Sequence, residues 1–183
     1  MGSNIAEPLT VAIIGGGITG INLALGLQAR NVRYTIFERA DGFREIGAGL
    51  GFSPNAERAM KALDPELLAA YKRVANPNGE DYFQWVDGCS EENELLYKLF
   101  VGKDGFQGCR RSDYLEEVSK LVPEGRVKFG KEIELLSKEA SGKIRLVFRD
   151  GTTSEADVGK LNLVKEKHII VHHVNLSSSS RRV

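Results

Sequence analysis

Residues 9–39 read LTVAIIGGGITGINLALGLQARNVRYTIFER, and this stretch decides the fold. It opens with a short continuous apolar run, Leu9 to Ile14, which is typical of a strand buried on both faces of a parallel sheet. Apolar residues then recur at helical spacing from Ile18 to Arg30, and Asn31 follows as a left-handed cap. Val32 to Phe37 is β-branched and aromatic, which predicts a second strand. The stretch therefore predicts a right-handed, parallel strand–helix–strand unit.

A glycine motif lies where the first predicted strand turns into the helix. Gly15, Gly17 and Gly20 form G-x-G-x-x-G, in which the glycines allow a tight turn, a close approach to a pyrophosphate and close packing of helix on strand. Glu38 closes the second strand 23 residues after Gly15, near the offset expected for an acid that binds a ribose. A carboxylate there accepts from ribose hydroxyls and repels a 2′-phosphate, so the motif favours FAD or NAD over NADP.

Two interpretations of this motif remain at this point. A glycine-rich turn also occurs in doubly wound folds that hold no dinucleotide, with the acid merely solvated at the strand end. The agreement of three glycines, their context and the acid favours a dinucleotide site. The spacing alone does not distinguish FAD from NAD.

The remaining chain alternates helix and strand signals. A glycine-rich loop is expected over residues 42–52, and Ser53-Pro54 and Asp64-Pro65 each predict a helix start. Asp113 and Glu116 read as a capping box, which places Arg111 just ahead of a helix. Predicted strands follow the order Tyr82–Val86, Leu95–Val101, Arg126–Phe129, Glu132–Ser137, Lys143–Arg149 and Glu155–Val158, of which the first two form an antiparallel pair in a substrate-facing sheet.

Two further segments carry a family resemblance. Glu38-Arg39 with residues 43–63 (FREIGAGLGFSPNAERAMKAL), and residues 109–115 (CRRSDYL), resemble the flavin-dependent aromatic hydroxylases of the class A, salicylate hydroxylase-like type. The resemblance extends from about Leu9 to Val158. It implies an α/β fold, with a Rossmann-like FAD/NAD(P)-binding parallel sheet flanked by helices and part of an antiparallel substrate-domain sheet.

The resemblance also implies chemistry. Members of the family are FAD-dependent monooxygenases that use NAD(P)H as a transient reductant and O2 to hydroxylate a small phenolic or aromatic substrate. The implied cofactor-binding residues are Gly15, Gly17, Gly20, Glu38, Arg39, Gly51 and Arg111. A bidentate guanidinium suits a phosphate. The position of Arg111 is equally typical of a solvated arginine beside a helix start. Gly47, Gly49 and Gly51 are equally typical of a flexible surface loop. No catalytic residue is assigned.

Composition excludes several classes. Lys and Arg total 25, as do Asp and Glu, so no basic surface for nucleic acid is expected. No apolar run approaches the length of a membrane span and no secretion signal is evident, which favours a cytoplasmic protein. Cys89 and Cys109 lie far apart, and His168, His172 and His173 lack acidic or thiol partners, so no metal site is expected.

The end of the chain departs from the family pattern. Residues 159–183 hold five basic residues against one acid and a serine run, and we interpret them as an aberrant, poorly packed tail of translated intron sequence. The predicted domains are an FAD-binding domain over 1–158, with 76–106 contributing to the substrate-side sheet, and this tail. We therefore expect a C-terminally truncated, inactive form of the enzyme. The alternatives are a non-catalytic nucleotide-binding remnant and a small NAD-dependent oxidoreductase.

Overall fold

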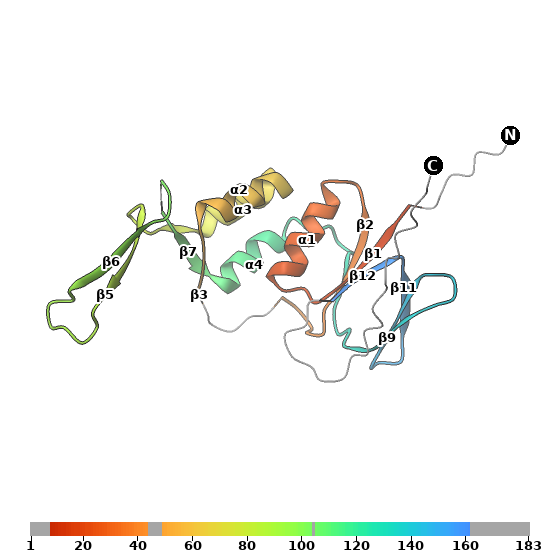
Figure 1. Cartoon of the computed structure of the whole chain (residues 1–183). Helices are drawn as coiled ribbons and strands as arrows, with labels where there is room; N and C mark the ends of the chain where they lie inside the picture. The colour runs from red at the N-terminus through yellow and green to blue at the C-terminus, as the bar shows by residue number, and fades with distance from the viewer. Residues whose placement is uncertain (1–7, 44–48, 104, 162–183) are drawn as a thin grey trace, which may run out of the picture.

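The computed structural model describes residues 8–43, 49–103 and 105–161 (Figure 1). Its centre is a four-stranded parallel sheet in the order β12-β1-β2-β8, formed by β1 (Thr10–Ile14), β2 (Arg33–Phe37), β8 (Val127–Lys128) and β12 (Val158–Leu161). Helix α1 (Ile18–Gln28) connects β1 to β2, which pair in parallel from Thr10 opposite Arg33 to Ile14 opposite Phe37. The predicted fold class is confirmed.

Alternate residues of β1 and β2 enter two different cores. Val11 and Ile13, with Tyr34 and Ile36, pack among the helices, where Ile21 and Leu25 of α1 are fully buried. Ala12, Ile14 and Phe37 face the opposite side and pack against the antiparallel sheet of β9 (Ile133–Lys138), β10 (Ile144–Phe148) and β11 (Thr153–Ala156). The parallel sheet is thus buried on both faces, as its continuous apolar strands predict.

The helices form a second region beside α1. Helices α2 (Pro54–Leu63), α3 (Pro65–Val74) and α4 (Arg111–Ser119) accompany a small antiparallel sheet in the order β3-β7-β4, made of β3 (Gly49–Phe52), β4 (Asn76–Pro77) and β7 (Gln107–Arg110). The two predicted proline starts are confirmed, and the Asp64 side chain accepts a hydrogen bond from the Glu66 amide. Among the described helices, none is long and apolar enough to cross a bilayer.

Hairpin β5 (Tyr82–Val86) and β6 (Leu95–Phe100) extends away from the other elements (Figure 1). The predicted antiparallel pairing is confirmed. Phe83 and Trp85 lie opposite Leu99 and Tyr97, so these four large side chains share one face of the hairpin. The other face carries Lys98, whose Nζ is 3.3 Å from a Glu80 carboxylate oxygen. Tyr82 and Phe100 lie on that face too, with ring centroids 5.4 Å apart, so both faces of the hairpin expose aromatic side chains.

Several predicted boundaries are wrong. Helix α1 ends at Gln28 rather than Arg30, although Asn31 does adopt the predicted left-handed conformation with φ 55°. The expected loop over 42–52 ends in a strand, β3, because its backbone pairs with β7. The Asp113–Glu116 capping box is absent, since α4 begins at Arg111 directly after β7 and Asp113 lies in its first turn.

The last predicted strand divides into two. β11 ends at Ala156, and Asp157 leads into β12, which pairs in parallel with β1 from Val158 opposite Val11 to Leu161 opposite Ile14. The boundary predicted at residue 158 therefore falls inside a strand, because residues 159–161 continue the parallel sheet. The rest of the predicted tail lies outside the described residues.

Asp157 anchors the turn between β11 and β12. Its Oδ2 accepts hydrogen bonds from the Thr10 hydroxyl at 2.7 Å and from the Thr10 amide at 2.8 Å, and these bonds hold the pKa of Asp157 below its ordinary value. A carboxyl with a lowered folded pKa stabilises the fold above its unfolded pKa, and this contribution is lost as the pH falls through the folded pKa.

We expect Asp157→Asn to lower the urea midpoint at pH 7 and to reduce the loss of stability on acidification below about pH 4. The stability of the wild-type protein should fall more steeply with acid than that of Asp157→Asn. Asp150, whose pKa is lowered to about 2 by Lys131, also contributes to the acid dependence of stability. The measurement is urea denaturation from pH 7 to pH 3, with the exposed neighbour Glu155→Gln as control. Equal pH profiles for wild type and Asp157→Asn would contradict the assignment.

Candidate cofactor site

The glycine turn, residues 15–17, connects β1 to α1 and is hydrogen-bonded to the end of β2. Gly15 has a φ of 99°, a left-handed conformation that a side chain disfavours, and its amide donates to the Phe37 carbonyl at 2.8 Å. Gly20 is buried on α1, and a Cβ there would lie 2.0 Å from the Gly15 carbonyl oxygen. The first and third glycines of the motif are therefore required by backbone geometry alone.

The second glycine sits at the start of α1. Gly17 is the N-cap residue and supplies no side-chain cap, and the first turn of the helix contains no acidic residue. Backbone amides of a first turn have no partner within their own helix, and they carry the positive end of the helix dipole. This end of α1 is chemically suited to a phosphate group.

Glu38 lies against the glycine turn. Its Oε2 accepts from the Gly16 amide at 2.6 Å, and its Oε1 accepts from the Ala40 amide at 2.9 Å. The Phe43 ring packs on the same turn, since a Cβ on Gly16 would lie 2.9 Å from it. The structure thus brings together the glycines and the acid, whereas Arg39 is exposed beside them.

Gly51 has a structural explanation of its own. It lies in β3 opposite Gly108, and a Cβ there would be 2.1 Å from a ring carbon of Phe106. The close approach at Gly51 is therefore to an aromatic side chain within the chain, which the sequence pattern did not indicate.

Arg111 is the first residue of α4, and its Nε is buried. Two hydrogen bonds align α4 with α1. The Tyr114 hydroxyl donates to Asn22 Oδ1 at 2.6 Å, and Gln28 Nε2 donates to the Leu121 carbonyl at 3.2 Å. Gln28 follows Asn22 by six residues, or about 9 Å of helix rise, and Leu121 lies two residues beyond the end of α4, so the two contacts occur in the same order along both segments. Helices α1 and α4 therefore run side by side in the same direction.

This parallel alignment places Arg111 toward the end of α1 that begins at the glycine turn. Arg111 precedes Tyr114 by three residues, as Thr19 in the first turn of α1 precedes Asn22. The first turn of α4 therefore lies toward the same end of the helix pair as the first turn of α1. Sequence reasoning selected Arg111 but missed Asn22 and Tyr114, because their contact joins residues 92 positions apart.

Three titratable side chains, Tyr71, Cys109 and Tyr114, belong to the core among the helices and are neutral. Burial raises the pKa of Tyr114 and of Tyr71 to about 12, and burial raises the pKa of the Cys109 thiol. All three remain protonated at neutral pH, so they act as packing and hydrogen-bonding groups. In the described ranges no three His, Cys, Asp or Glu side chains gather as a metal site, and the three histidines lie outside those ranges.

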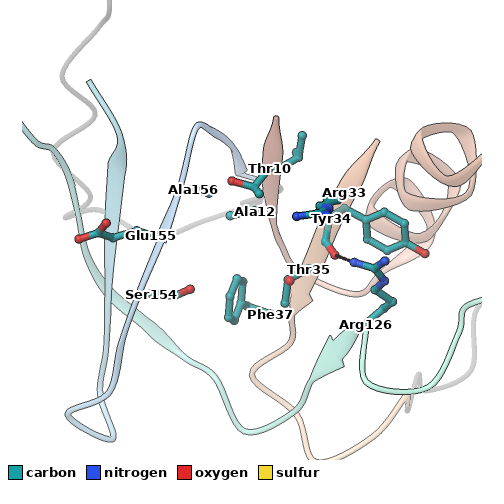
Figure 2. Close-up of a pocket in the computed structure, with 11 residues that line it drawn as sticks. Thr10, Ala12, Arg33, Tyr34, Thr35, Phe37, Arg126, Ser154, Glu155 and Ala156 are labelled. Atoms are coloured by element: carbon teal, nitrogen blue, oxygen red, sulfur yellow. Dashed lines mark hydrogen bonds between the residues drawn. The ribbon is translucent and has the colours of Figure 1, made fainter. Parts of the chain in front are cut away.

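A pocket of about 170 Å³ lies along β1 and β2, between them and β11 (Figure 2). Thr10 and Arg33, the first residues of β1 and β2, line it together with Ser154 and Glu155 of β11. Arg126 donates to the Tyr34 carbonyl at its margin. Phe37, the last residue of β2, also lines the pocket, so the pocket extends along the strands toward the end that bonds to the glycine turn.

Comparisons with known proteins agree with this geometry. Residues 10–72 match the pyridine nucleotide-disulphide oxidoreductase family. An FAD-dependent monooxygenase of Monascus ruber is 54% identical over 158 residues, which is 82% of this chain and 36% of that protein. A salicylate hydroxylase of Sarocladium schorii is 39% identical over 163 residues, 82% of this chain and 34% of that protein. Over most of its length the chain is similar to FAD-dependent monooxygenases.

Solved structures give the same result. A salicylate hydroxylase solved as a substrate complex matches with a TM-score of 0.68 and 32% identity, over 84% of this chain and 35% of that one. The predicted resemblance is confirmed. The chain spans about a third of the length of the curated relatives described above.

Proposed function

We propose that this chain binds FAD through the cofactor's ADP half. Glu38 accepts from the adenosine ribose, and the first turn of α1 with Arg111 holds the pyrophosphate. The contact between Glu38 and the Gly16 amide carries this proposal, since it places the ribose-binding acid on the glycine turn. Gly17, without a side chain at the helix start, leaves room for a phosphate to approach the backbone. Arg39 and Gly51 are assigned to the border of the same site.

The activity proposed for the whole enzyme is that of an FAD-dependent monooxygenase that hydroxylates a small phenolic or aromatic substrate, and we propose that this chain by itself is an inactive form that binds the cofactor. Bound FAD would supply the redox chemistry, taking electrons from NAD(P)H and passing them to O2. The names of the relatives support this class, among them a salicylate hydroxylase. Within the described residues, the chain's contribution is to bind and orient the cofactor. The two cysteines, both free thiols, suit a reducing cytoplasm.

The substrate side of the proposed enzyme is the region 76–106. Hairpin β5–β6 presents Phe83, Trp85, Tyr97 and Leu99 on one face, and each of these side chains is exposed by two-fifths or more. Aromatic side chains favour edge-to-face and offset contacts with other rings. We assign this apolar face to the substrate side, and residues 1–158 as a whole to the FAD-binding domain.

Titration of the full chain with FAD tests the proposal. We expect saturable quenching of flavin fluorescence with one FAD per chain, and competition by ADP, because the assigned contacts are to the ADP half. NAD should compete more weakly than FAD. Saturable binding of NAD with no binding of FAD would instead favour the small NAD-dependent oxidoreductase, and binding of neither would overturn the dinucleotide site.

A further inference from the structure

We propose that the Tyr114–Asn22 pair is a positioning device that holds Arg111 toward the glycine turn, and thereby sets affinity for the pyrophosphate of a bound dinucleotide. The inference rests on the proposed FAD site and names residues that the glycine and acid motifs do not include. It starts from a hydrogen bond of 2.6 Å that joins two helices through residues 92 positions apart in the chain.

The pair is placed where a small shift has a large effect. Tyr114 is completely buried, and its ring packs against both Phe52 and Tyr71, with ring centroids 5.6 and 6.0 Å away. The ring therefore has a fixed position, and its hydroxyl fixes α1 through Asn22. Residues three apart lie on the same face of a helix, so Arg111 is on the Tyr114 side of α4, one turn nearer the glycine turn.

A positioned guanidinium matters more for phosphate than for other ligand groups. Bidentate binding requires that a planar fork meets two oxygens at fixed distances. Rotation or sliding of α4 along α1 would move Arg111 away from the phosphate, whereas Glu38 at the end of β2 would keep its place. Loss of the Tyr114 hydroxyl should therefore weaken ligands that carry a pyrophosphate and spare adenosine, which lacks one.

A second buried tyrosine provides a matched control. Tyr34 is 3% exposed, and its hydroxyl donates to Gln28 Oε1 at 2.7 Å. This bond also joins a tyrosine to α1, but at the end of the helix opposite to the glycine turn, about 9 Å from Asn22. Tyr34→Phe and Tyr114→Phe each remove the hydroxyl of a buried tyrosine that bonds to α1. Tyr34→Phe should leave the bond from Gln28 Nε2 to Leu121 in place, and Tyr34 lies farther from the proposed site.

The experiment measures dissociation constants of the full chain for ADP and adenosine by calorimetry. We expect Tyr114→Phe to weaken ADP roughly tenfold and adenosine less than twofold, and Tyr34→Phe to leave both nearly unchanged. In an Arg111→Ala background, Tyr114→Phe should cause no further loss of ADP affinity, because it acts through Arg111. Thermal melting verifies that each variant is folded, and Asn22→Ala serves in the same design if Tyr114→Phe does not fold.

Each contrary result has its own meaning. Equal losses for ADP and adenosine, or additive effects of Tyr114→Phe and Arg111→Ala, overturn the positioning role while the FAD site stands. A wild-type chain that binds neither ADP nor FAD overturns the proposed function, and the positioning role with it.

Discussion

Gly20→Ala is expected to prevent stable folding of the strand–helix–strand unit. The added Cβ would lie 2.0 Å from the Gly15 carbonyl oxygen and 3.2 Å from its carbonyl carbon, and both are backbone atoms. Neither can move without displacing the turn that joins β1 to α1, and Gly20 is buried in that junction. We expect a loss of about 3 kcal/mol or more in the free energy of unfolding, measured by urea denaturation.

Gly26→Ala is the matched control for this prediction. Gly26 also lies in α1 and is also buried, but a Cβ there would meet only the Cδ2 end of the flexible Leu63 side chain, at 2.9 Å. Alanine favours a helix over glycine by about 1 kcal/mol, which offsets the adjustment of Leu63. The loss in the free energy of unfolding should therefore be several-fold larger for Gly20→Ala than for Gly26→Ala. Similar losses would show that Gly20→Ala acts through helix packing in general and not through the glycine turn.

Local sequence signals predicted the parallel centre of the fold because the relevant residues act over short distances. The apolar run of β1, the spacing of α1 and the left-handed Asn31 each depend on neighbours within a few positions. The acid Glu38 was also predictable, because the length of one strand–helix–strand crossover fixes its distance from Gly15. These features specify the phosphate end and the ribose end of the proposed site.

Other features depend on distant partners. β3 is rich in glycine and resembles a loop, and it forms a strand because Gly51 pairs with Gly108 of β7. The same sheet sets the start of α4, since Arg110 still pairs with Gly49 and the chain becomes helical at the next residue. A local capping pattern at Asp113 does not compete with that pairing. The Asn22–Tyr114 contact likewise follows from how two helices align, which neither helix encodes alone.

Glu38→Ala should produce the largest loss of cofactor binding among single changes at this site. The carboxylate is the charged acceptor assigned to the ribose hydroxyls, and removal of such an acceptor costs about 1.5 to 3 kcal/mol, or roughly 10- to 150-fold in affinity. It also accepts from the Gly16 and Ala40 amides, so its loss loosens the turn that faces the ligand. Titrations of FAD, ADP and adenosine with the purified variant measure the effect.

The pattern across ligands distinguishes this role from that of Arg111. ADP and adenosine both contain the ribose, so Glu38→Ala should weaken both, ADP at least as much as adenosine, whereas Arg111→Ala should weaken ADP alone. Wild-type protein should also reject 2′,5′-ADP, because the carboxylate repels a 2′-phosphate, and Glu38→Ala should lose that discrimination. Glu38→Gln keeps the size of the side chain and one acceptor oxygen, so its ligand affinities should lie between those of the wild type and Glu38→Ala. Unchanged affinities in Glu38→Ala, with the thermal melt intact, would remove Glu38 from the site and leave the glycine turn without its ribose partner.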